Sequence, residues 1–289
     1  LTDTGTGALL QGMKGQAHRS ADELAAAIAL LGDAVDGLEA AGRLSDASFN
    51  ASMLADCLAT RGAFAEAEVA VARAARLGHE SGDPNAVLDA DLISGRIAME
   101  RGDLEEALVY TQRSLDAAEA VGNTFCALAG NFLLADQKLR LGDTQEAIDH
   151  LERSTGLAQS CHAGGFEALG QAWLTAAHAR TGSFDPAGFT GPLEMAIRAG
   201  SRSGEAMVRL QRAMAVAGAG RPTDTFDDFE RAITLFADYG ALPALARAHS
   251  AYGHVLRAVG RPDDATPHLR EAGAILTELG LNPDPAALR

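Results

Sequence analysis

The chain has 289 residues, of which 47% are hydrophobic and only 5% aromatic, and its formal net charge is -15. The apolar fraction suffices for a buried core, and the scarcity of aromatic residues favours close-packed helices over a β-sandwich. The acidity, with Lys14 and Lys138 as the only lysines and with singly scattered arginines, argues against direct nucleic-acid binding and against a polybasic membrane patch.

Glycines divide the chain at a regular interval of about 40 residues. One ladder runs, with gaps of 40, 40, 40, 38 and 40, through Gly62, Gly102, Gly142, Gly182, Gly220 and Gly260. A second ladder lies half a period later, with His162 and Arg202 where glycine is missing, at Gly42, Gly82, Gly122, Gly240 and Gly280. Apolar residues between the ladders recur at steps of three and four, which predicts helices. The period therefore predicts about seven antiparallel helix pairs, over 5–42, 43–82, 83–122, 123–162, 163–202, 203–240 and 241–280, with a tail at 281–289.

The stretches RGDLEEALVY (101–110) and LGDTQEAIDH (141–150) repeat one corner motif. Gly102 and Gly142 are expected to end the first helix of a pair in the left-handed conformation. Asp103 with Glu106, and Asp143 with Glu146, are expected to form capping boxes on the second helix. A small residue follows five positions after the corner, which predicts close helix crossings at Ala27, Ala67, Ala107, Ala147, Ala187, Thr225 and Ala265.

The fifth pair is irregular. Its second helix would contain Gly188, Gly191 and Pro192, and proline inside a helix removes a hydrogen bond and clashes with the preceding turn. We expect a broken or kinked helix between 185 and 193. The disrupted segment 182–225 is open to two interpretations, a loop insertion or a ligand-gated hinge.

The Gly-Asp-x-x-Glu-Ala corner resembles the tetratricopeptide repeat, and Gly95 and Gly253 fall where that family places a small residue in its first helix. This resemblance implies one all-α domain over 1–289, built as a right-handed superhelix, although the usual period is about 34 residues. The longer repeats are similar to the C-terminal regions of LuxR-type ATPase regulators and cyclase/ATPase signalling proteins, as in residues 244–280. HEAT and armadillo arrays, with periods in the 40s, are the alternative.

The resemblance also implies a binding surface on the inner wall, formed by the first helix of each pair. Counting from the corner glycines, the groove candidates are Phe49, Asp56, Arg96, Met99, Phe132, Asp136, Arg140, Trp173, Met207, Met214, His254 and Arg257. Further positions of the same kind are Gln16, Arg19, Arg180 and Leu210. For the apolar members, packing between repeats is the competing interpretation. The family's peptide-carboxylate clamp of Lys and Asn residues is not reproduced.

No catalytic, metal or cofactor motif is recognisable. The sequence has no P-loop, GxSxG or HExxH, and Cys57, Cys126 and Cys161 form no CxxC pair, which indicates buried thiols in a reducing compartment. The acidic pairs Glu105-Glu106, Asp227-Asp228 and Asp263-Asp264 fall at helix starts, where the dipole favours negative charge. His249 and His254 are five residues apart and are interpreted as surface or groove histidines.

Three functional classes remain. The first is a non-catalytic protein-interaction or effector-sensing domain of a bacterial signalling or transcription-regulatory protein, a context implied by the resemblance alone. The second is a receptor for a small peptide or metabolite inside the superhelix, and the third is an all-helical enzyme, which the periodic carboxylates disfavour. Without an apolar run of about 18 residues or an export signal, we expect a cytoplasmic protein with protein or peptide partners and self-association through the terminal repeats.

Overall fold

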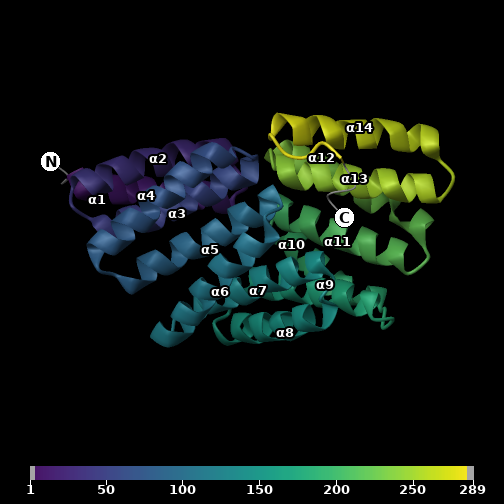
Figure 1. Ribbon diagram of the computed structural model, residues 1–289, viewed down its shortest axis with the longest axis horizontal. Coiled ribbons are helices and arrows are strands. Elements are labelled where there is room, and N and C mark those ends of the chain that lie inside the picture. The colour runs from purple at the N-terminus through teal and green to yellow at the C-terminus, as the bar shows by residue number, and fades with distance from the viewer. Residues whose placement is uncertain (1–3, 285–289) are drawn as a thin grey trace. The chain divides into compact units, whose positions relative to one another are not determined.

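The computed structural model describes residues 4–284, and over that range the chain is helical with no β-strand. Within the described residues, fourteen α-helices, α1 to α14, follow one another along the chain, which confirms the predicted all-α fold (Figure 1). The helices form two compact units, residues 1–137 and 138–289, and the boundary falls inside α7. The single domain and the superhelical hand stay predictions.

The first unit, unit 1, contains three complete helix pairs. Each pair packs against the next, and the first helices of neighbouring pairs are in direct contact, α1 with α3 and α3 with α5. The helices are α1 (Thr4–Ser20), α2 (Leu24–Ala40), α3 (Leu44–Arg61), α4 (Phe64–Ser81), α5 (Pro84–Arg101), α6 (Leu104–Val121) and the first part of α7 (Thr124–Leu141).

The second unit, unit 2, contains the end of α7 and the remaining elements. Its core between α11 and α14 includes the fully buried side chain of Phe229 and the nearly buried side chains of Leu256 and Tyr252. The elements are α8 (Thr144–Ser160), α9 (Gly164–Arg180), the 3-10 turn η1 (Pro186–Phe189), α10 (Thr190–Arg198), α11 (Arg202–Gly218), the 3-10 turn η2 (Pro222–Thr225), α12 (Phe226–Tyr239), α13 (Leu242–Ala258) and α14 (Pro262–Glu278).

The glycine ladders mark the helix ends, as predicted. Every ladder glycine has a positive φ, between 69° and 93°, which is the left-handed region that glycine enters without a Cβ penalty. At Gly102 the helix closes through hydrogen bonds from Gly102 N to Met99 O and from Asp103 N to Ala98 O. Asp22 and His162, which replace glycine in the ladders, also lie at φ 57°. The chain geometry at these corners is therefore kept even where the side chain changes.

The prediction that Arg202 forms the second corner of the fifth pair was wrong. The left-handed residue there is Gly200 (φ 66°), whereas Arg202 already begins α11. The two-residue deletion thus lies before Gly200, in the second helix of the pair. The expected break between 185 and 193 is confirmed, because Pro186 opens η1 and α10 is only nine residues long. Ala187 lies in η1, within this break, and is exposed. The other six predicted crossing residues are fully buried.

The predicted capping boxes do not form. Asp103 and Asp143 precede their helices, but neither side chain accepts a hydrogen bond from the helix start. Their ψ angles of 65° and 62° lie outside the extended region in which a capping side chain reaches the N–H groups. Instead, Lys138 Nζ lies 2.6 Å from Glu146 Oε2 and 3.8 Å from Asp143 Oδ2. Side-chain caps occur where the residue is extended, as at Asp83 and Ser201.

Candidate functional site

Three charged side chains from successive first helices meet in unit 1. Asp56 of α3 lies between Arg19 of α1 and Arg96 of α5, which precede and follow it by 37 and 40 residues. Arg96 Nη1 pairs with Asp56 Oδ1, and Arg19 Nη1 lies 3.5 Å from Asp56 Oδ2. We call these three residues the charged column. The structure therefore brings together three of the groove candidates that the resemblance implied.

Burial and hydrogen bonding hold the charged column in place. The Asp56 side chain is 15% exposed and that of Arg96 29%, while that of Arg19 keeps 38%. Arg96 Nη2 also donates to Thr60 Oγ1 at 2.8 Å, and this hydroxyl donates to the Asp56 carbonyl at 2.8 Å. Two guanidinium groups share one carboxylate in the column, and a ligand can reach it through Arg19, the most exposed of the three side chains.

The sequence analysis missed two residues of this surface, Thr60 and Asp89. Thr60 lies two residues before Gly62 and anchors Arg96, as described above. Asp89, in α5 exactly 40 residues after the exposed Phe49, accepts a hydrogen bond from Cys126 Sγ at 3.3 Å. Burial raises the pKa of Asp89, although the thiol contact opposes this shift. The repeat register would have found Asp89, had Phe49 been extended by one period.

The cysteines of unit 1 are not nucleophiles. Burial raises the pKa of Cys57 to about 11, and Arg19 only partly opposes this shift. Burial, with Asp89 nearby, also raises the pKa of Cys126. Because the thiolate is the reactive form, burial disfavours nucleophilic chemistry at both side chains. Cys161 is exposed.

The other predicted groove residues fall into two groups. Phe132, Asp136, Arg140, Met207 and His254 are half-buried, while Phe49, Met214 and Arg257 are exposed. Two predictions were wrong, because Met99 and Trp173 are only 4% exposed. Met99 packs with Ala98, Ala107 and Leu133 in the core of unit 1.

Residues Arg180 and Met207 of unit 2 have structural partners. Arg180 Nη1 donates to the Leu139 carbonyl at 2.7 Å, where a helix end leaves its last carbonyls without intrahelical donors. Met207 packs against the buried cluster that contains Leu210. For these two apolar residues, packing between helices is therefore the interpretation that the structure supports.

A buried ionic cluster joins α11 to α12. Asp228 is 5% exposed and accepts hydrogen bonds from Arg209 Nη1 at 2.9 Å and from Arg212 Nε at 2.6 Å. Glu205 Oε1 accepts from Arg209 Nε at 2.8 Å and from Arg231 Nε at 3.2 Å. Burial raises the pKa of Glu205, but the hydrogen bonds from the two arginines outweigh it and lower this pKa overall. Asp228 is therefore held by tertiary ion pairs and not by the helix dipole alone.

His249 of α13 is not a surface histidine. Its Nδ1 lies 2.9 Å from Nδ1 of His268 in α14, so one ring donates and the other accepts. The His268 ring also contacts Tyr252, whose hydroxyl donates to Glu230 at 3.0 Å. Burial, followed by the charge of His268, lowers the pKa of His249 to about 4. Burial also lowers the pKa of His268, against the opposing charges of Glu230 and Asp264.

This pair predicts an acid-sensitive contact in unit 2. Because the folded pKa of His249 is below its ordinary value of 6.5, its contribution to stability is present above pH 6.5 and is lost as the pH falls toward 4. We expect acidification from pH 7 to 4 to destabilise the wild type by about 2 kcal/mol more than His249→Gln. Urea titrations at several pH values measure this difference, with exposed His79→Gln as the control. A His249→Gln slope equal to that of the wild type would contradict the assignment.

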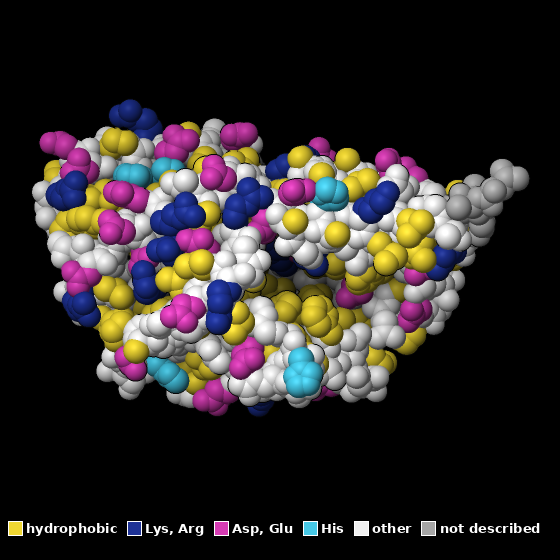
Figure 2. Space-filling view, turned by 180° about the vertical axis from the view of Figure 1, so that it is seen from behind, with side chains coloured by type: hydrophobic (Ala, Val, Ile, Leu, Met, Phe, Trp, Pro, Cys, Tyr) yellow, Lys and Arg dark blue, Asp and Glu magenta, His cyan; other side chains and the backbone are white. Residues whose placement is uncertain are grey.

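The described residues offer no group of three or more His, Cys, Asp or Glu side chains placed to hold a metal ion. Among residues 4–284, no helix has the length and hydropathy needed to cross a membrane. On the face that Figure 2 shows, Lys and Arg side chains lie among Asp and Glu side chains. The visible charges are mixed, in agreement with the scattered arginines of the sequence.

No family model and no curated protein matches the chain. Several solved structures are similar to the chain. A Rap protein complexed with competence and sporulation factor is 14% identical with a TM-score of 0.76, covering 93% of this chain and 75% of its own. The Rap conjugation gene regulator of plasmid pLS20, in complex with the Phr* peptide, is 12% identical with a TM-score of 0.75, at 92% and 72%. Aspartyl phosphate phosphatase F from Bacillus subtilis is 12% identical with a TM-score of 0.68, at 96% and 73%. The chain therefore shares the tetratricopeptide-like helical-repeat fold of the Rap proteins.

Proposed function

We propose that the chain is a non-catalytic regulator in a bacterial signalling or transcription-regulatory system, and that it binds a peptide or an extended protein segment on the first helices of unit 1. The observation that carries this proposal is the charged column, in which three successive first helices contribute one partly buried side chain each. The Rap conjugation gene regulator, which has the same fold and was solved in complex with the Phr* peptide, supports it.

The chemistry of the column suits a peptide better than a small metabolite. Exposed Phe49 lies two helical turns before Asp56 on α3, so an apolar contact is available next to the charges. Bidentate guanidinium groups recognise carboxylates and carbonyl oxygens, which fixes the register of a chain laid across the helices. A metabolite receptor is less well supported, because Trp173, the only tryptophan among the groove candidates, is 4% exposed and presents no open ring to a ligand.

Calorimetry of the full chain against an arrayed library of short peptides tests this function. We expect saturable binding of at least one peptide, weakened about tenfold or more by Asp56→Ala and by Arg96→Ala, because each change breaks the column. Arg101→Ala is the matched control, since this arginine lies on the same helix and pairs with Glu68 at an exposed site. Binding that both column variants leave intact would move the site elsewhere.

A further inference from the structure

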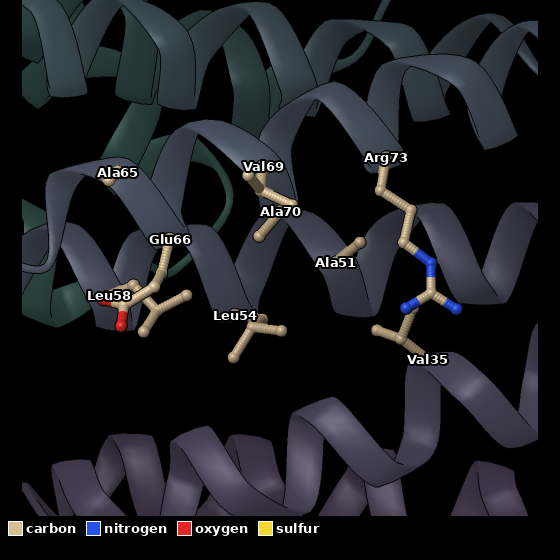
Figure 3. Close-up of a pocket in the computed structure, with 9 residues that line it drawn as sticks. All are labelled: Val35, Ala51, Leu54, Leu58, Ala65, Glu66, Val69, Ala70 and Arg73. Carbon is tan, nitrogen blue, oxygen red and sulfur yellow. The ribbon is translucent and has the colours of Figure 1, made fainter.

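A shallow apolar groove lies on unit 1 between α2 and α4, with α3 as its floor. Its volume is about 420 Å³, and its lining is Val35, Ala51, Leu54, Leu58, Ala65, Glu66, Val69, Ala70 and Arg73. Figure 3 shows Leu58 and Glu66 at one end, Leu54 in the middle, and Val35 with Arg73 at the other end. Val69 on its wall is 71% exposed, so its side chain is accessible to a partner. We call this feature the α2/α4 groove.

The next repeat fills the same position with polar side chains. Forty residues after Ala51 stands Asp91, and forty after Arg73 stands Arg113, whose Nε donates to Asp91 Oδ2 at 2.6 Å. The Arg113 guanidinium also lies 5.1 Å from the ring centre of Tyr110, which takes the place of Ala70. Alanines at 51 and 70 therefore keep the α2/α4 groove open, where the following repeat closes its own surface with an ion pair and a ring.

The open charge at the rim of the groove is negative. Arg73 is already neutralised, because its Nη1 donates to Asp36 at 2.7 Å and its Nη2 to Glu39 at 2.6 Å. Glu66 has no ion pair or hydrogen-bonding partner among the described residues. Residues 1–137 as a whole contain 21 acidic and 9 basic side chains. A basic occupant therefore complements this surface.

We propose that the α2/α4 groove docks an amphipathic helix of a partner protein, with two or three apolar side chains in the groove and a Lys or Arg against Glu66. The groove follows α4 from Ala65 to Arg73, about 12 Å, which is about two turns of a helix. Helical side chains at i, i+4 and i+7 lie on one face over that length.

An extended peptide fits this surface poorly. Unlike the charged column, the groove is lined mainly by apolar side chains, and its Arg73 is already held by Asp36 and Glu39. The backbone groups of its helices are bonded within each helix, so the N–H and C=O groups of an extended segment would find few partners there. In a helix these groups are satisfied internally, and only side chains need to meet the groove. The site is separate from the charged column, and its occupation is independent of the function proposed above.

Fluorescence anisotropy of the full chain with three labelled, stapled helical peptides tests the proposal. The probes carry Leu at i, i+4 and i+7 with flanking Lys, the same Leu with flanking Glu, or Ser at the Leu positions with flanking Lys. We expect saturable binding of the Leu/Lys probe and at least about tenfold weaker binding of the other two. Val69→Glu should weaken the Leu/Lys probe about tenfold or more, and Glu66→Lys should shift the preference toward the Glu probe.

Val109→Glu is the matched control, because Val109 occupies the same repeat position on α6 and is 64% exposed, but next to the filled surface. It should bind the Leu/Lys probe as the wild type does. Equal effects of Val69→Glu and Val109→Glu, or no saturation up to about 1 mM probe, would overturn the proposal. So would a concentration-dependent dimer in sedimentation that Val69→Glu abolishes, since the groove would then belong to a second copy of the chain.

Discussion

Asp228→Ala is expected to lower the free energy of unfolding of unit 2 by about 3 to 5 kcal/mol. The substitution leaves Arg212, whose side chain is 30% exposed, without its carboxylate partner, and it leaves Arg209, 19% exposed, with Glu205 alone. Unpaired charges in such surroundings keep the cost of desolvation and lose the compensating attraction. The loss is therefore much larger than for an ion pair at the surface, which contributes about 1 kcal/mol or less.

Asp227→Ala is the control for this prediction. Asp227 precedes Asp228 in the first turn of α12 but is exposed, so only its favourable interaction with the helix dipole is lost, about 0.3 to 1 kcal/mol. Urea unfolding followed by circular dichroism compares the two variants. If Asp227→Ala and Asp228→Ala shift the midpoint equally, the dipole explanation is sufficient and the buried cluster contributes little.

The ionic cluster also shows a limit of sequence analysis. The spacing of acidic pairs places Asp227 and Asp228 equally at a helix start, and only the α11–α12 packing distinguishes them. The partners of Asp228 precede it by 19 and 16 residues, on another helix and across an irregular connection. Local spacing carries no information about such a pairing. The same holds for His249 and His268, which are joined only when α14 folds back on α13.

The backbone was more predictable than the side chains. Positive φ angles at the ladder glycines follow from a repeated steric requirement, which glycine satisfies in every copy. The capping boxes failed because capping depends on the ψ angle of a single residue, and the tight corner sets that angle near 65° at Asp103. The prediction of a corner at Arg202 was wrong because the repeat is two residues shorter before this corner, which therefore falls at Gly200. From the sequence alone, the two missing residues could equally have been placed after the corner.

The part of the candidate site that could be predicted is the part that depends only on the repeat period. Arg19, Asp56 and Arg96 lie together because the 40-residue period returns the chain to the same face of successive first helices. Met99 and Trp173 were wrong because both side chains are buried, each with only 4% of its surface exposed. Whether a groove candidate faces solvent depends on how the neighbouring helices pack against it, and the period does not specify that packing.

The helix crossing at Gly95 leads to the second large effect. A Cβ at Gly95 of α5 would lie 2.3 Å from Thr111 Oγ1 and 3.1 Å from both the Ala107 carbonyl oxygen and Thr111 N of α6. Thr111 is fully buried, and its hydroxyl donates to Ala107 O and accepts from Gln137 Nε2, each at 2.8 Å. The hydroxyl therefore cannot move without breaking buried hydrogen bonds.

Gly95→Ala is consequently expected to destabilise unit 1 by about 2 to 3 kcal/mol, from overpacking and the strained hydroxyl, after about 1 kcal/mol of gained helix propensity is offset. Gly253→Ala is the matched control in the corresponding position of α13. Its Cβ would meet the Leu269 side chain at 2.7 Å, and Leu269 is half-exposed and can rotate away, so the change should be nearly neutral.

A double-mutant cycle isolates the cause. In the Thr111→Ala background the obstructing oxygen is absent, so Gly95→Ala should cost at least about 1 kcal/mol less than it does in the wild type. Thermal and urea unfolding of the four chains supply the cycle. An additive result would mean that the backbone approach of α5 to Ala107, and not the threonine, makes glycine necessary. In that case the requirement would come from the crossing itself, and two small residues would together account for it: Gly95, which the resemblance pointed out, and Ala107, which the period predicted.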